Sequence, residues 1–144
     1  MQLASKKFEY SRSASELVQA DVYLRSGDGN CLFDVTFSNG VLTVPKLTAN
    51  KWTETFFRNH IAFEHLGYYG YFSKNITSYV MLMDRFIKHK QHLFNNLHKE
   101  VLTEVKDFYF AHLCDSLDVH CKSKWRARWF RFTNLSNHER FWDA

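Results

Sequence analysis

Alternating hydrophobic positions dominate the first part of the chain and helical spacing dominates the middle. Residues 21–25 are typical of a short strand, and residues 31–37 and 41–44 favour two more. The segment Ser38-Asn39-Gly40 joins the last two, and Asn-Gly is a strong signal for a tight hairpin turn. The first part of the chain therefore predicts three strands, two of them in a hairpin.

Helical patterns begin at about Thr48. The clearest runs from Ser73 or Asn75 to Lys88, with apolar residues spaced i, i+3, i+4 and i+7 at Ile76, Tyr79, Val80, Met83 and Ile87. We expect Ser73 or Asn75 to cap this helix by accepting a free backbone N–H. Another helix is predicted over residues 94–113.

Alternation returns near the C-terminus. Residues 117–121 and 124–132 favour two strands, because aromatic or small side chains alternate there with basic ones at Trp125, Arg126, Ala127, Arg128 and Trp129. The order of elements predicts an α+β fold in which a small mixed sheet packs against helices.

Composition and length favour one globular domain over residues 1–144. We expect residues 1–20 to form an N-terminal extension or a lead-in helix, with helical pattern at Ser15–Gln19, and residues 21–141 to form the core. No stretch reaches the roughly 20 apolar residues of a membrane span, and no secretory signal is present, so no membrane partner is expected. Three irregularly spaced cysteines argue against a disulfide framework and favour a reducing, cytoplasmic location.

The stretch Gly27-Asp28-Gly29-Asn30-Cys31-Leu32-Phe33 is the strongest chemical signal in the chain. A cysteine acts as a nucleophile when it is a thiolate with a basic partner, commonly histidine. Small residues before it allow backbone N–H groups to stabilise an oxyanion. A glycine-rich loop that runs directly into a cysteine is typical of a thiol enzyme.

The same stretch resembles, almost letter for letter, the nucleophile motif of the ovarian tumour (OTU) family of cysteine proteases and deubiquitinases. Weaker similarity extends over residues 21–141 and includes Phe57-Arg58, Tyr79–Met83 and Asn134–His138. The resemblance implies a papain-type fold and a thiol isopeptidase that removes ubiquitin or a ubiquitin-like modifier. It also implies that a helix follows the cysteine, where local pattern predicts a hairpin.

The resemblance also implies roles for individual residues. Cys31 would attack the isopeptide carbonyl, and His138 would be its base. Asp28 would support the oxyanion loop or orient the histidine, while N–H groups of Cys31 with Gly29 or Asn30 would form the oxyanion hole. The family often has Asn or Asp two residues after the histidine, where this chain has Arg140. Asp28, Asn137 and Asp143 are therefore all candidates for the third catalytic residue.

Simpler interpretations stand beside these. Cys31 is alternatively a small hydrophobic residue after a turn, and His112 and His120 are rival bases. Cys114, His120 and Cys121 lack the spacing of a zinc site, so no metal or cofactor is expected.

A basic and aromatic segment, residues 122–132, supports a second class of function. Basic residues interleaved with aromatic ones can bind single-stranded nucleic acid, and the net charge of +4 helps binding to an acidic partner. The alternatives to a protease are thus a non-enzymatic basic protein that binds nucleic acid or a host factor, as in a phage or mobile element, and an inactive OTU-like interaction domain. Ubiquitin is the expected partner of the enzyme, in a host cytosol if the chain is an effector or viral protein.

Overall fold

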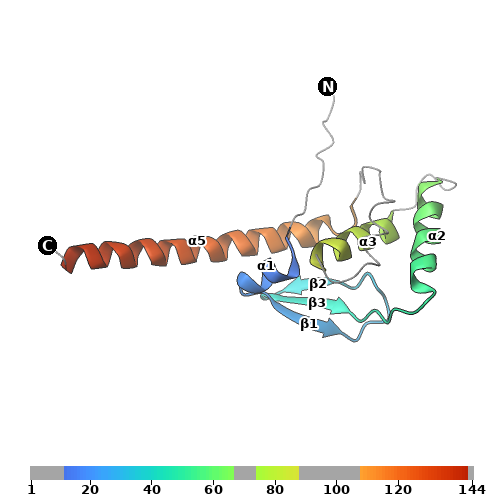
Figure 1. Ribbon diagram of the computed structural model, residues 1–144, viewed down its shortest axis with the longest axis horizontal. Coiled ribbons are helices and arrows are strands. Elements are labelled where there is room, and N and C mark those ends of the chain that lie inside the picture. Colours follow the sequence, from blue (N-terminus) through green and yellow to red (C-terminus); the bar gives the residue numbers. More distant parts are fainter. Residues whose placement is uncertain (1–11, 67–73, 88–107, 143–144) are drawn as a thin grey trace, which may run out of the picture.

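The computed structural model describes residues 12–66, 74–87 and 108–142 of the chain, and of residues 135–142 it describes the backbone alone (Figure 1). The described part is an α+β fold with a small mixed sheet of three strands packed against helices. The elements in chain order are α1 (Ala14–Gln19), β1 (Tyr23–Gly27), β2 (Thr36–Ser38), β3 (Val41–Pro45), α2 (Thr53–His65), α3 (Asn75–Phe86) and α5 (Ala111–Trp142).

The sheet has the strand order β1-β3-β2. Strand β3 pairs with β1 in parallel and with β2 in antiparallel, and Ser38 lies opposite Val41. The two residues between them, Asn39 and Gly40, have φ angles of 50° and 76°. A two-residue hairpin turn that matches the twist of its strands needs positive φ at both central positions, which Asn and Gly tolerate best. The predicted turn is therefore confirmed, but the strand predicted over residues 31–37 is wrong for residues 31–35, because β2 begins only at Thr36. Cys31 to Val35 form a turn and irregular backbone, not the helix that the resemblance implied.

Helices α2 and α3 confirm the helical pattern of the middle of the chain. Their contact is made by stacked rings of Phe57 and Tyr79, whose centroids are 5.8 Å apart. Of the two residues expected to cap α3, Ser73 lies outside the described residues and Asn75 Oδ1 accepts no hydrogen bond. A carboxylate from α2 lies at the start of α3 instead. Glu64 accepts hydrogen bonds from the backbone N–H groups of Ile76 and Thr77, at 2.8 and 2.9 Å. A negative charge there satisfies free N–H groups and complements the positive end of the helix dipole.

Helix α5 occupies the residues for which two strands were predicted, so that prediction is wrong. Leu117 is fully buried while Val119 is 68% exposed, whereas residues two apart in a strand share a face. The buried residues Phe110, Cys114, Leu117 and Cys121 follow helical spacing instead. Of the helix predicted at 94–113, residues 94–107 lie outside the described residues, and Ala111–Leu113 begin α5.

One hydrophobic core joins the helices to the sheet. Its most buried members come from nearly every element, and they include Leu17, Leu42, Phe57, Val80 and Leu117. Helix α1 lies where the lead-in helix was expected, near Ser15–Gln19. Its start is capped by a capping box between Ser13 and Glu16. Figure 1 shows α5 crossing the domain beside α1 and the sheet and then extending well beyond them toward the C-terminus.

Candidate functional site

The loop that carries Cys31 lies where β1 and β3 end. Gly27, the last residue of β1, pairs with Pro45, the last residue of β3. The chain then crosses that end of the sheet to enter β2 at Thr36. Asp28, Gly29, Asn30 and Cys31 are all exposed on this crossing.

Local contacts shape the loop. The N–H of Asp34 donates to the carbonyl of Cys31 at 3.2 Å, which closes a turn. A Cβ at Gly29 would lie 3.2 Å from an Asp34 carboxylate oxygen, so the glycine permits a close approach there. Phe33 anchors the loop through edge contact with Tyr79, with centroids 6.1 Å apart. The thiol of Cys31 is thus presented to solvent by a loop whose next residues are held in the core.

The predicted base lies on the other side of the molecule. Helix α5 meets the sheet at the opposite end from Cys31: His120 Nε2 is 3.1 Å from the carbonyl oxygen of Ala20, and its ring contacts Phe37. Further along, Arg128 pairs with Asp21, just before β1 begins. His138 is ten residues beyond Arg128, which adds about 15 Å of helix in the direction away from the sheet. The backbone therefore does not bring Cys31 and His138 together.

The remaining candidates are also dispersed. Asn137 shares the distal part of α5 with His138, and the side chains of both lie outside the described residues. Asp143 lies outside them entirely. His120, a rival base, is held at the hairpin end of the sheet, and His112 is exposed near the start of α5.

The other two cysteines are core residues. Burial raises the pKa of the Cys114 thiol to about 12, and the neighbouring charge of Asp115 adds to the effect. Burial also raises the pKa of Cys121. Across residues 12–66, 74–87 and 108–134, no group of three His, Cys, Asp or Glu side chains is placed to hold a metal ion.

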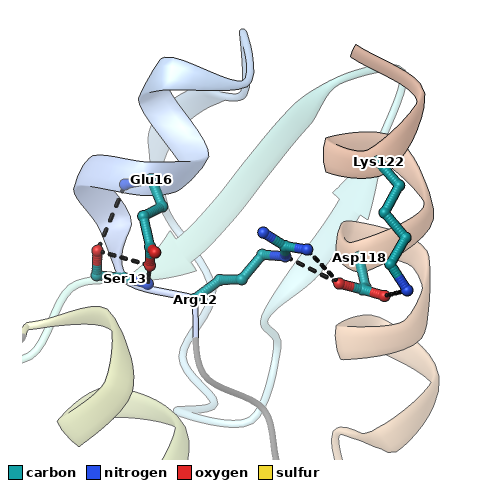
Figure 2. Close-up of polar contacts among 5 residues, drawn as sticks. All are labelled: Arg12, Ser13, Glu16, Asp118 and Lys122. Atoms are coloured by element: carbon teal, nitrogen blue, oxygen red, sulfur yellow. Dashed lines mark hydrogen bonds and ion pairs between the residues drawn. The ribbon is translucent and has the colours of Figure 1, made fainter. Parts of the chain in front are cut away.

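Two ionic contacts hold the first half of α5 against the N-terminal part of the chain. In the first, Asp118 accepts a hydrogen bond from Arg12 Nε at 2.9 Å and pairs with Lys122 at 2.7 Å (Figure 2). The hydrogen bond from Lys122 is the largest cause of a lowered Asp118 pKa; burial opposes it, and Arg12 lowers the pKa further. The guanidinium of Arg12 also lies 4.4 Å from the ring centre of Trp125.

The second contact centres on Asp21, which has a positive φ of 60° at the turn between α1 and β1. Its carboxylate accepts a hydrogen bond from Arg128 at 2.9 Å and lies 3.9 Å from the ammonium nitrogen of Lys124. Both sides of this contact are largely exposed, so it orients the helix more than it stabilises the fold. Together the two contacts fix α5 as far as Arg128.

A basic and aromatic surface lies on α5 beside these contacts. One stripe of the helix borders a shallow open hollow of about 620 Å³, and the stripe consists of Lys122, Trp125, Arg126, Trp129, Phe130 and Thr133. We call these six residues the α5 stripe. Trp129 is 69% exposed and Phe130 is 66% exposed, so large apolar rings stand in solvent next to positive charges. Such a surface can bind a partner that offers both acidic and apolar groups.

A second hollow of about 260 Å³ lies beside the Cys31 loop. It is apolar, and its lining comprises Leu32, Leu47, Asn50, Trp52, Thr53, Phe56 and Phe57. Since Leu32 follows Cys31 directly, an apolar group bound there would lie near the exposed thiol.

Comparison with known proteins places the chain in a family. The family model DUF247, described as a plant protein of unknown function, matches residues 2–93. The chain belongs to this family. The DUF247 match includes the sheet, the Cys31 loop, α2 and α3, and it ends before α5. Comparison with curated proteins and with solved structures gives no match.

Several residues of this DUF247 protein that hold the α5 stripe in place were missed by sequence reasoning. Arg12 and Asp118 are 106 positions apart and Asp21 and Arg128 are 107 positions apart, and no local pattern reveals such pairs. The basic and aromatic residues of the α5 stripe were identified, but on a strand. Helical spacing within residues 122–133 is the signal that could have placed them on one face.

None of the described helices is long and apolar enough to cross a membrane.

Proposed function

We propose that this chain is a non-enzymatic binding domain that engages an acidic partner through the α5 stripe. The observation that supports this proposal most is that Trp129 and Phe130 are exposed beside Lys122 and Arg126. They lie on a helix that the rest of the domain holds in place. Exposed aromatic and arginine side chains supply much of the binding energy at protein interfaces. The core then serves to orient α5.

Charge supports the same proposal. Residues 119–138 contain no Asp or Glu, while five Lys or Arg residues lie between 122 and 131. Within the described part of the chain, Arg126 and Arg131 have no acidic partner, unlike Lys122, Lys124 and Arg128. Unpaired positive charge on an exposed helix raises the rate and affinity of binding to an acidic surface.

A charge-reversal experiment tests the proposal. The wild-type chain should be retained on a heparin column to a higher salt concentration than the double variant Arg126→Glu, Arg131→Glu. The control is Lys46→Glu, Lys51→Glu, which makes the same change in net charge at exposed positions away from α5. Equal loss of retention in the two double variants would show that net charge alone is responsible and would contradict the proposal.

A thiol isopeptidase is the second proposal, with an OTU-like core within the α+β fold. It is supported by the exposed Cys31 on a loop with Asp28, Gly29 and Asn30, and by the apolar hollow beside Leu32. The expected substrate is ubiquitin or a ubiquitin-like protein, in the cytoplasm. A ubiquitin probe with a C-terminal electrophile should label the wild type and not Cys31→Ala. Absence of labelling in the wild type would remove this proposal, and ubiquitin binding without labelling would favour an inactive interaction domain.

A further inference from the structure

Beyond Arg128, the described side chains of α5, up to Asn134, are exposed on more than one side. Among the described side chains, the ionic contacts of α5 with the rest of the domain end at Arg128, and Trp129, Phe130 and Phe132 are each at least 65% exposed just beyond it. Successive residues of a helix are separated by about 100° around its axis, so Trp129 and Phe130 point in clearly different directions. Figure 1 shows this part of the helix extending away from the sheet, where a partner can reach it from several sides.

The large rings of α5 have the spacing of a helix that docks into a groove. Trp125, Trp129 and Phe132 occupy positions i, i+4 and i+7, and the rings of Trp129 and Phe132 lie 6.2 Å apart. Helices that bind in apolar grooves use anchors at i, i+3 or i+4, and i+7. Trp125 is partly covered by Arg12, and Trp129 and Phe132 are more exposed than Trp125.

The charges of α5 are not separated from its rings. Arg126 lies next to Trp125 and Trp129 on the α5 stripe, and Arg131 lies between Phe130 and Phe132 in sequence. A helix that rests on a bilayer keeps its basic and apolar residues on opposite faces, because only one face meets the lipid. Cations that flank the anchor rings instead suit a protein groove that receives the exposed side of the helix and offers apolar walls and an acidic rim.

We propose that α5, from Lys122 to Phe132, docks as a preformed helix into the apolar groove of an acidic protein, of the class that opens a methionine-lined groove on binding calcium. The inference rests on the proposed function and names its partner class. The helix is already ordered and held by Asp21 and Asp118, so docking avoids the cost of folding the helix on binding.

Calmodulin is the probe, because its acidic groove opens only when calcium is bound. The full chain should bind calmodulin in a calcium-dependent complex, followed by tryptophan fluorescence and by isothermal titration calorimetry. The double variant Trp129→Ala, Phe132→Ala should bind at least tenfold more weakly. The control double variant Tyr23→Ala, Phe63→Ala removes two aromatic rings from exposed positions on β1 and α2 and should bind as the wild type does.

Single-stranded DNA and vesicles containing phosphatidylserine are titrated in parallel. Binding to either of these without calmodulin binding would overturn the inference and leave the proposed function standing. Absence of binding to all three, together with equal heparin retention of the charge variants, would overturn both. Calmodulin binding that persists in the Trp129→Ala, Phe132→Ala variant would show that α5 is not the docking helix.

Discussion

Arg12 and Asp118 are 106 positions apart in sequence, and their hydrogen bond joins the N-terminal segment to α5. The side chain of Arg12 is only 15% exposed, and its guanidinium also lies over the ring face of Trp125. A charge-assisted hydrogen bond in such a setting is stronger than an isolated surface ion pair. This contact therefore helps to set the direction in which α5 leaves the domain.

Replacing Asp118 with Asn should lower the free energy of unfolding by about 1 kcal/mol at pH 7. The folded-state pKa of Asp118 is below its ordinary value of 3.8, so the charge contributes stability above that value. The contribution is lost as pH falls through the lowered folded-state pKa. Urea unfolding at pH 7 and at pH 2.5 should show a difference between the two proteins that shrinks at the lower pH. A constant difference would mean that the charge of Asp118 is not responsible.

Replacing Glu64 with Ala should destabilise the fold by about 2 kcal/mol, because its carboxylate accepts three hydrogen bonds at the start of α3. One of them comes from the hydroxyl of Thr77, which is fully buried and would be left without this acceptor. Glu54→Ala is the matched control, since Glu54 forms an exposed pair with Arg58 in the same helix. Its cost should be about 0.5 kcal/mol or less by thermal or urea unfolding. Equal costs would argue against the capping role.

Leu117→Ala should cost about 2–5 kcal/mol, because it removes a fully buried side chain from the core. Val119→Ala, only two residues away, should change stability by about 0.5 kcal/mol or less, since that side chain is mostly exposed. Urea unfolding of the pair distinguishes a helix from a strand at this segment. Similar large costs at both positions would favour the strand.

The three cysteines should differ sharply in reactivity. Cys31 is exposed, whereas Cys114 and Cys121 are buried and their pKa values are raised. At pH 8 the native chain should react rapidly with Ellman's reagent at one thiol per chain, and the other two should react about a hundredfold more slowly. Cys31→Ser should abolish the rapid phase. A rapid phase of two or three thiols would contradict the packing of α5.

Local chemistry made part of the fold predictable. The turn at Asn39-Gly40 is specified by two residues that tolerate positive φ, and α3 is specified by a repeating apolar face. Helix α5 was missed because Trp, Arg and Phe in residues 124–132 also satisfy a two-residue alternation. The absence of Gly and Pro after Gly70 was a signal for an uninterrupted helix.

The candidate site was less predictable than the fold. The stretch around Cys31 specifies an exposed loop, but the position of His138 depends on whether residues 124–138 turn back as strands or continue as a helix. A helix carries His138 away from the sheet, because each residue adds about 1.5 Å in one direction. The contacts of Arg12 and Asp21 with α5 depend on tertiary packing alone, and no short-range sequence pattern predicts them.

The strand order has a consequence for how the domain assembles. Strand β3 lies in the middle of the sheet although it comes last in sequence. Its hairpin with β2 closes a two-residue loop, and such loops form within microseconds. Pairing with β1 must close a longer segment that includes the Cys31 loop, so its entropic cost is greater. We therefore expect β1 to join a hairpin that already exists, and amide protons between β1 and β3 to gain protection after those between β2 and β3.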